Sequence, residues 1–355
     1  MTNITETIFE NNCLLDDKSD LPTSAGLVLF ADEQDNPIQL LTASNIRRVV
    51  KNKLAEQEEK SKRADLKSIT AKIYYSACPC RFRLAIKHLD AARKIFGTSY
   101  KDHIKFVRPW FIKTDISEKF PFFSITKKPA FKAGEKILGP YPSQKAAATA
   151  LNTLEDTFKL CRRSDLVGNP AASASCPYLQ MASCLGVCAG KISEEEYRHI
   201  MEDAFSAGAN PAEAIEKLER QMQTAAKELN FELAAELKRR IEKLSVLKKQ
   251  TYCWTGDLEK LKIVHTDKSA KIKQKGIRAK KQTLAVFVIS FFEVIDLGDF
   301  VDEKKEKIAQ AVEKALPQIC RPSDVISNST EILEKFSVIS YFLYRTGSKG
   351  VWQKR

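Results

Sequence analysis

The sequence lacks the features that would place it in a membrane or send it through one. Met1 to Glu6 show neither the basic start nor the apolar run of a secretory signal. The longest apolar candidate, 284–292, falls far short of the ~18 residues that a spanning helix needs, and its length suits a buried strand. We therefore expect a cytoplasmic protein without a membrane partner.

Glycine and proline are also scarce, at 13 each in 355 residues, while hydrophobic residues make up 43% of the chain. This composition argues against a disordered chain and predicts two or three modest folded domains. Lysine and arginine number 58 against 45 acidic residues, a net charge of +13. Such an excess favours polyanionic partners such as DNA, although it also serves solubility.

Disulfide bonds are not expected, because the nine cysteines are an odd number in a reducing compartment. Paired C-x-x-C knuckles, the common zinc signature, are absent. Four cysteines instead share one irregular segment with the spacing C-x14-C-x7-C-x3-C, namely Cys161, Cys176, Cys184 and Cys188. Four thiolates suit zinc or an iron–sulfur cluster, and unligated core cysteines are the alternative. Arg162 and Arg163 beside the first ligand are expected to favour its thiolate form.

The start of the chain predicts a β-hairpin followed by a basic helix. Residues 25–30 and 38–41 have strand composition, and the Asp- and Asn-rich segment 32–37 between them is typical of a turn. Residues 1–20 are expected to be flexible. A helix beginning near Asn45 turns Ile46 and Val50 inward. Its other face is either solvated or binds phosphate, and it carries Arg47, Arg48, Lys51 and Lys53.

Further elements follow from periodicity and caps. Residues 139–143, Gly-Pro-Tyr-Pro-Ser, break the chain, and Ser143 is a candidate N-cap for the next helix. Another helix should start after Ser193, with acidic residues in its first turn. The remaining predicted helices are 85–95, 144–158, 303–316 and 330–344, and the remaining predicted strands are 110–112, 122–125 and 284–295.

The clearest periodicity runs from 211 to 249, where apolar residues recur every three or four positions. It predicts two amphipathic helices that meet at Leu229-Asn230-Phe231. A unit of ~40 residues cannot cover all of its apolar surface, so we expect it to dock onto a second hairpin. An ordinary antiparallel helical pair is the alternative interpretation.

The order of these residues resembles the UVR motif that the excinuclease proteins UvrB and UvrC share, with Lys238-Arg239 where the family usually has Arg-Asp. The resemblance implies a UvrB-like protein as partner. The implied partner-binding residues are Leu218, Met222, Leu229, Phe231, Glu232, Ala235 and Ile241.

The cysteine segment, followed by Gly190 and Glu196-Tyr197, resembles that of the UvrC family, which belongs to the excinuclease ABC complex. Residues 139–142 upstream match the same family, so the landmarks cover roughly 21–250 in the family's order. The resemblance implies a 4Fe–4S cluster on the four cysteines, with zinc as the alternative.

Residues 25–54 resemble the GIY-YIG nuclease module, but the residues expected to catalyse hydrolysis do not match. Hydrolysis of a phosphodiester needs an activated water, a carboxylate for a metal ion and positive charge at the phosphorane. Val28 occupies the first tyrosine position, 39–41 read Gln-Leu-Leu, and Val49 occupies the arginine position. Arg48 and Asp90 are the weak candidates for replacing the lost groups. We expect a retained scaffold.

Residues 251–355 leave too little room for the family's RNase H-like domain and its repeats, so we expect a truncated α/β region. Residues 284–289 resemble a strand from the start of that domain. The strand is followed by Glu293, Asp296 and Asp299. We expect these three to be solvated turn residues, and a metal site is the alternative. A basic loop is also predicted, which either is solvated or binds phosphates. It contains Lys268, Lys271, Lys273, Lys275, Arg278, Lys280 and Lys281.

The predicted fold class is α+β and multidomain. Its parts are a flexible start (1–20), a degenerate GIY-YIG-like α/β module (21–110), a connector (111–160), a metal segment (161–205), an antiparallel UVR hairpin (206–250) and a C-terminal α/β region (251–355). The resemblance implies a nucleotide excision repair protein that binds DNA and a UvrB-like partner without efficient incision. The alternatives are an active, divergent GIY-YIG endonuclease and a regulatory adaptor of a kinase or protease system.

Overall fold

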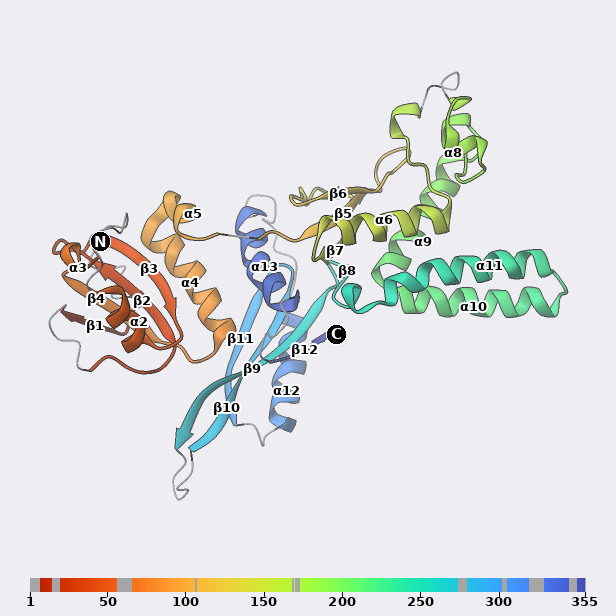
Figure 1. Ribbon diagram of the computed structural model, residues 1–355. Helices are drawn as coiled ribbons and strands as arrows, with labels where there is room; N and C mark the ends of the chain where they lie inside the picture. Colours follow the sequence, from red (N-terminus) through yellow and green to blue (C-terminus); the bar gives the residue numbers. More distant parts are fainter. Residues whose placement is uncertain are drawn as a thin grey trace.

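The computed structural model describes residues 7–14, 20–55, 66–105, 107–167, 169, 173–273, 280–301, 305–318, 329–344 and 350–354. These residues build three four-stranded antiparallel sheets with helices packed around them, which confirms the α+β multidomain class (Figure 1). No helix within these ranges is long and apolar enough to cross a membrane.

The N-terminal module contains a sheet with the strand order β1 (Asn11–Leu14), β4 (Lys72–Ala77), β2 (Gly26–Ala31), β3 (Pro37–Ala43). The predicted hairpin of β2 and β3 is confirmed. The Asp32 carboxylate fixes its turn by accepting hydrogen bonds from the backbone N–H groups of Gln34 and Asn36, at 2.9 and 2.8 Å.

Two helices cover opposite faces of this sheet because side chains alternate along β2. Val28 and Phe30 pack with α2 (Ile46–Lys53). Leu27 and Leu29 pack with α4 (Arg81–Phe96) on the other face. The short helices α3 (Leu66–Ile69) and α5 (Tyr100–His103) complete the module.

Two parts of this module differ from the sequence prediction. Residues 11–14, expected to be flexible, form β1, because they hydrogen-bond to the free edge of β4. The α4 helix begins at Arg81, four residues before the predicted start, because the Cys80 Sγ caps it by accepting from the backbone N–H of Arg83 at 3.5 Å.

The central sheet has the order β6 (Ser124–Thr126), β5 (Trp110–Asp115), β7 (Glu135–Tyr141), β8 (Gly256–Asp257). The Gly139-Pro140-Tyr141 segment, predicted as a break, ends β7, and its Gly139–Pro140 peptide is cis. Glycine is required there, since a Cβ on Gly139 would lie 2.6 Å from a ring carbon of Phe111.

Helices of the central part follow the predicted caps. The Ser143 Oγ accepts a hydrogen bond from the Ala146 N–H at 3.1 Å, which starts α6 (Gln144–Phe158) as predicted. The short α8 (Pro177–Gln180) lies in the cysteine segment. Ser193 and Glu196 form a capping box that starts α9 (Glu194–Ala209), also as predicted.

The C-terminal sheet has the order β11 (Val294–Val301), β10 (Lys280–Ser290), β9 (Lys262–Lys273), β12 (Val351–Lys354). It packs with α12 (Lys305–Ala315) and α13 (Ser329–Tyr344), which confirm the two predicted helices. The predicted strand 284–295 is confirmed for 284–290, which belong to β10, but it is not continuous, because a turn separates β10 from β11. There the Ser290 Oγ accepts from the Phe292 and Glu293 N–H groups, at 3.1 and 3.0 Å.

The N-terminal module is fixed against the C-terminal sheet through α4. Phe82 is fully buried and makes edge contacts with the Phe287 and Trp352 rings, at 4.9 and 5.5 Å between centroids. Beside it, the Arg83 guanidinium pairs with Asp296 at 2.5 Å and with Asp299 at 2.8 Å. The module is therefore part of one body with the C-terminal sheet.

Candidate partner-binding hairpin and cysteine cluster

A helical hairpin of α10 (Pro211–Lys227) and α11 (Phe231–Leu244) projects from the central part, as the periodicity predicted (Figure 1). Asn230 closes the turn in two ways. Its backbone N–H donates to the Ala225 carbonyl at 2.8 Å, and its side chain accepts from the Leu233 N–H at 3.2 Å. The preceding Leu229 adopts a left-handed backbone with φ of 58°. The turn thus holds the two helices antiparallel.

The inner stripe of the hairpin is already covered by the chain itself. Ile215, Leu218 and Ala225 of α10 pack with Leu237 and Leu244 of α11 in one buried cluster that continues under α6. Leu218 is only 7% exposed, which corrects its prediction as a partner-binding residue, because the hairpin's own core takes up the side chain. Met222 and Ile241 are half-buried at the margin of the same cluster.

The tip of the hairpin, by contrast, presents apolar side chains to solvent. Leu229 is 72% exposed, Phe231 66% and Leu233 43%. Glu232 and Ala235 are exposed on the same end of α11. Isolated exposed apolar residues are common on proteins, but three large ones within five positions make this tip a candidate interaction surface. The sequence indicated Leu229 and Phe231 and missed Leu233.

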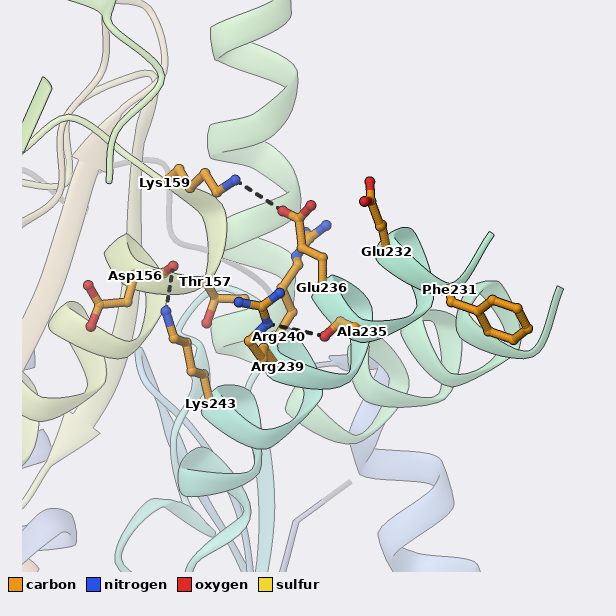
Figure 2. Close-up of a pocket in the computed structure, with 10 residues that line it drawn as sticks. All are labelled: Asp156, Thr157, Lys159, Phe231, Glu232, Ala235, Glu236, Arg239, Arg240 and Lys243. Atoms are coloured by element: carbon orange, nitrogen blue, oxygen red, sulfur yellow. Dashed lines mark hydrogen bonds and ion pairs between the residues drawn. The ribbon is translucent and has the colours of Figure 1, made fainter. Parts of the chain in front are cut away.

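A groove of about 700 Å³ runs beside this tip, between the end of α6 and α11 (Figure 2). Its lining residues are Asp156, Thr157, Lys159, Phe231, Glu232, Ala235, Glu236, Arg239, Arg240 and Lys243. Figure 2 shows Phe231 at the far end of α11, away from Lys243 and Asp156. The sequence did not predict the groove, because tertiary packing brings 156–159 to a helix that begins over 70 residues later.

Polar contacts fix the inner part of this groove. The Lys159 Nζ lies 3.0 Å from the Glu236 carboxylate, and this hydrogen bond lowers the pKa of Glu236. The Lys243 Nζ donates to the Asp156 carbonyl at 3.2 Å. Among the described residues, the Arg239 Nε donates within its own helix, to the Ala235 carbonyl at 3.3 Å. The outer part, near Phe231 and Arg239, is where a partner could add contacts.

The structure brings the four predicted cysteine ligands into one neighbourhood. Cys161, Cys176 and Cys188 are buried, and Cys184 is half-buried. Burial raises the pKa of Cys161 to about 11, and the nearby Cys184, Cys188 and Cys176 add to that rise. Burial likewise raises the pKa of Cys184, with Cys176 and Cys188 contributing. Thiols separated by up to 27 positions in the sequence therefore lie within electrostatic range of one another.

The two arginines beside Cys161 were predicted to favour its thiolate form, but their guanidinium groups pair with carboxylates. Arg162 pairs with Glu155 and Asp156, and Arg163 pairs with Asp165 at 2.6 Å. Both guanidinium groups are therefore engaged by carboxylates. Within the described ranges, no group of three or more His, Cys, Asp or Glu side chains is arranged to hold a metal ion. The metal centre stays a prediction from the donor set.

The residues considered for nuclease activity lie on different elements of the N-terminal module. Val28, at the tyrosine position, is fully buried under α2. Arg48 is exposed on α2, where its Nη2 donates to the Ser44 Oγ at 3.2 Å. Asp90 belongs to α4, near Lys335 and Arg93, and burial raises its pKa. Arg48 and Asp90 therefore lie on helices that cover opposite faces of the sheet.

The acidic residues after β10 also have another role than predicted. Asp296 and Asp299 are exposed to solvent as predicted, but they belong to β11, and both pair with Arg83 of the N-terminal module. Sequence reasoning missed this contact, since 213 positions separate Arg83 from Asp296.

The predicted basic surfaces are exposed, with differences in detail. Lys51 and Lys53 of α2 face solvent, whereas the Arg47 Nε donates to the Leu21 carbonyl at 2.7 Å and so supports the fold. The predicted basic loop is wrong in part, because Lys268, Lys271 and Lys273 belong to β9, and Lys280 and Lys281 begin β10. Lys275 and Arg278 lie outside the described residues.

In a comparison with known proteins, the central part of the chain matches two family models. Residues 109–207 match the family model "UvrC/Cho excinuclease, middle domain", and residues 212–247 match "UvrB/uvrC motif". No solved structure matches the chain.

Curated relatives agree with the family models. The UvrABC system protein C of Methanothermobacter thermautotrophicus is 24% identical over 265 residues, 68% of this chain and 41% of that protein. The protein of the same name from Caldicellulosiruptor saccharolyticus is 26% identical over 321 residues, 89% of this chain and 51% of that one. That from Syntrophus aciditrophicus is 35% identical over 136 residues, 37% of this chain and 21% of that one. The chain thus spans about half or less of the relatives' length, and the matches identify a UvrC-type middle domain followed by a UvrB/uvrC motif within it.

Proposed function

We propose that this protein acts in nucleotide excision repair, where it binds a UvrB-type partner through the α10–α11 hairpin and DNA through basic surfaces. The observation that carries the proposal is the exposed apolar tip of Leu229, Phe231 and Leu233 on a hairpin whose own core is complete. These three side chains lie outside the buried core of the hairpin, so they are available to a second molecule that would cover them. The match to the UvrB/uvrC motif supports a helical hairpin as that molecule.

The N-terminal module acts in this proposal as a scaffold without efficient incision activity. Support comes from the buried Val28 and from the sheet that separates Arg48 from Asp90. The bridge from Arg83 to Asp296 and Asp299 further ties the module to the C-terminal sheet. Positioned catalytic groups are needed for hydrolysis of a phosphodiester, and these residues are not positioned together.

The proposal includes a 4Fe–4S cluster on Cys161, Cys176, Cys184 and Cys188, with zinc as the alternative. The support is the donor set, since four largely buried thiols lie within electrostatic range of one another and both groups accept four thiolates. A bound cluster would cross-link the irregular segment between Cys161 and Cys188. Visible absorbance with matching iron and sulfide content in anaerobically purified protein is expected for the cluster, and colourless protein with zinc would favour the alternative.

The test of partner binding uses the full chain and a purified UvrB-type protein in a titration. Phe231→Ala should weaken binding by about 30-fold or more, as for a central aromatic anchor worth about 2 kcal/mol. Val107→Ala is the matched control, because Val107 is 75% exposed and lies far from the hairpin in sequence. Binding should be unchanged in this control.

Two outcomes would overturn the proposal. One is the absence of any binding between the wild-type chain and UvrB-type proteins. The other is selective, Phe231-dependent binding of a kinase or protease component, which would instead support the regulatory adaptor.

A further inference from the structure

The basic part of the β9–β10 hairpin is a two-stranded arm that extends beyond its sheet (Figure 1). The neighbouring β11 reaches only as far as Thr283, which pairs with Val301. On the other edge, β12 pairs with β9 between Ile263 and Thr266. Residues 271–273 and 280–282 therefore pair only with each other, as Lys271 with Gln282, Ile272 with Lys281, and Lys273 with Lys280.

Three lysines share one face of this arm. Lys271 and Lys273 are two positions apart on β9, and Lys280 lies directly opposite Lys273, so all three side chains project to the same side. Residues 268–273 and 280–284 contain no aspartate or glutamate. Among the residues that the structure describes, no ion pair is formed by Lys271, Lys273 or Lys280. The face therefore carries uncompensated positive charge.

Protection of exposed strand edges is one reason for lysines in such an arm. A lysine with a glutamate opposite it would also protect the edge, and the opposite charges would stabilise the pairing of the two strands. Like charges directly opposite each other instead destabilise a hairpin. The facing Lys273 and Lys280 thus work against the arm's own stability, and an anionic ligand between them would relieve the repulsion.

The dimensions of the arm fit one kind of polyanion. A two-stranded ribbon enters the major groove of duplex DNA, which is about 12 Å wide. Lysines two positions apart on a strand are spaced by roughly 6.8 Å, so they can reach different phosphates along the groove. The α2 surface is a weaker candidate, because the helix has eight residues and Arg47 is bonded to the Leu21 carbonyl.

We infer that the β9–β10 arm lies in the major groove of duplex DNA, with Lys271, Lys273 and Lys280 against the phosphates. This inference rests on the proposed DNA-binding function and assigns it to one surface. It leaves α2 as a solvated face of the scaffold.

Fluorescence anisotropy of the full chain with a labelled duplex, measured over a range of salt concentrations, tests the inference. Each phosphate contact contributes ~0.9 to the slope of log K against log salt, so changing Lys271, Lys273 and Lys280 to Ala should lower its magnitude by ~2.7. The matched control removes three charges from α2 by changing Arg48, Lys51 and Lys53 to Ala. Its slope should equal that of the wild type.

A single variant separates recognition from edge protection. Lys273→Glu places a glutamate opposite Lys280, so the arm should become more stable, with slower amide exchange at 271–273 and 280–282. DNA affinity should nevertheless fall by at least tenfold. Unchanged affinity in this variant would overturn the inference.

The remaining outcomes distinguish the inference from the function on which it rests. A wild-type chain that binds no DNA would overturn the DNA-binding function itself. Wild-type binding that loses its salt dependence in the α2 variant, and keeps it in the arm variant, would overturn only the assignment to the arm. Equal affinity for the duplex and for its separated single strands would overturn binding in the groove.

Discussion

A buried carboxylate on α13 holds the N-terminal module in place, and its removal should destabilise the protein strongly. The side chain of Glu334 is completely buried. It accepts from the Arg93 Nη2 at 2.8 Å and from the Tyr100 hydroxyl at 2.5 Å, and both donors belong to the N-terminal module. Lys101 and Arg108 lie within 3.9 Å of the same carboxylate. Its charge is therefore well matched by several cations.

Glu334→Gln keeps the shape of the side chain and removes its charge. Arg93, with its side chain 16% exposed, would then face a neutral group together with Arg108. Breaking a buried ion pair in this way costs about 3–5 kcal/mol, and we expect a decrease in the free energy of unfolding in that range. Urea unfolding of the full chain measures the decrease, and amide exchange in α4 and α5 should become faster.

Glu331→Gln is the matched control, because Glu331 pairs with the same Arg93 at 2.9 Å but its side chain is 52% exposed. Exposed pairs contribute about 1 kcal/mol or less, so this variant should stay close to the wild type. Equal losses in the two variants, or a loss below about 1 kcal/mol for Glu334→Gln, would refute the role of burial.

Three further predictions follow from the buried groups. Burial lowers the pKa of His265 from 6.5 to about 4, so the unfolded state binds the proton more readily. The free energy of unfolding should keep its full value above pH 6.5 and decrease by about 3 kcal/mol on acidification toward pH 4. Urea unfolding midpoints measure this decrease, which should be absent in His265→Phe. Leu218→Ala should lower the free energy of unfolding by about 2–5 kcal/mol in thermal or urea unfolding, while the folded variant still binds its partner. Weaker binding by a variant of unchanged stability would contradict this prediction. Replacing Cys184 and Cys188 with Ser should abolish metal content measured by elemental analysis, whereas Cys253→Ser should retain it.

Local signals in the sequence predicted the elements that depend on local physics. The β2–β3 hairpin has its turn chemistry in 32–37, α6 has Ser143 as a cap, and the α10–α11 hairpin has regular apolar spacing. As a continuous strand, the prediction for 284–295 failed because Phe291 and Phe292 are buried within a turn. Hydrophobicity alone does not distinguish such a turn from a continuous strand.

The candidate site shows the same division. Apolar periodicity marked both Leu218 and Phe231, but only the assembled hairpin shows that the first is buried and the second exposed. Contacts between distant segments carry the rest, as in the bridge from Arg83 to Asp296 and in the groove between α6 and α11. Neither the bridge nor the groove can be recognised from a local pattern in the sequence, because each depends on how separate elements pack.

In the proposed function, this protein binds a partner and DNA and does not cut DNA through its N-terminal module. The most direct measurement mixes the purified chain with a lesion-containing duplex, a UvrB-type protein and magnesium, and separates complexes and DNA strands on native and denaturing gels. A slower-migrating complex with intact strands is the predicted result. Metal-dependent strand cleavage that is abolished by Arg48→Ala would contradict it.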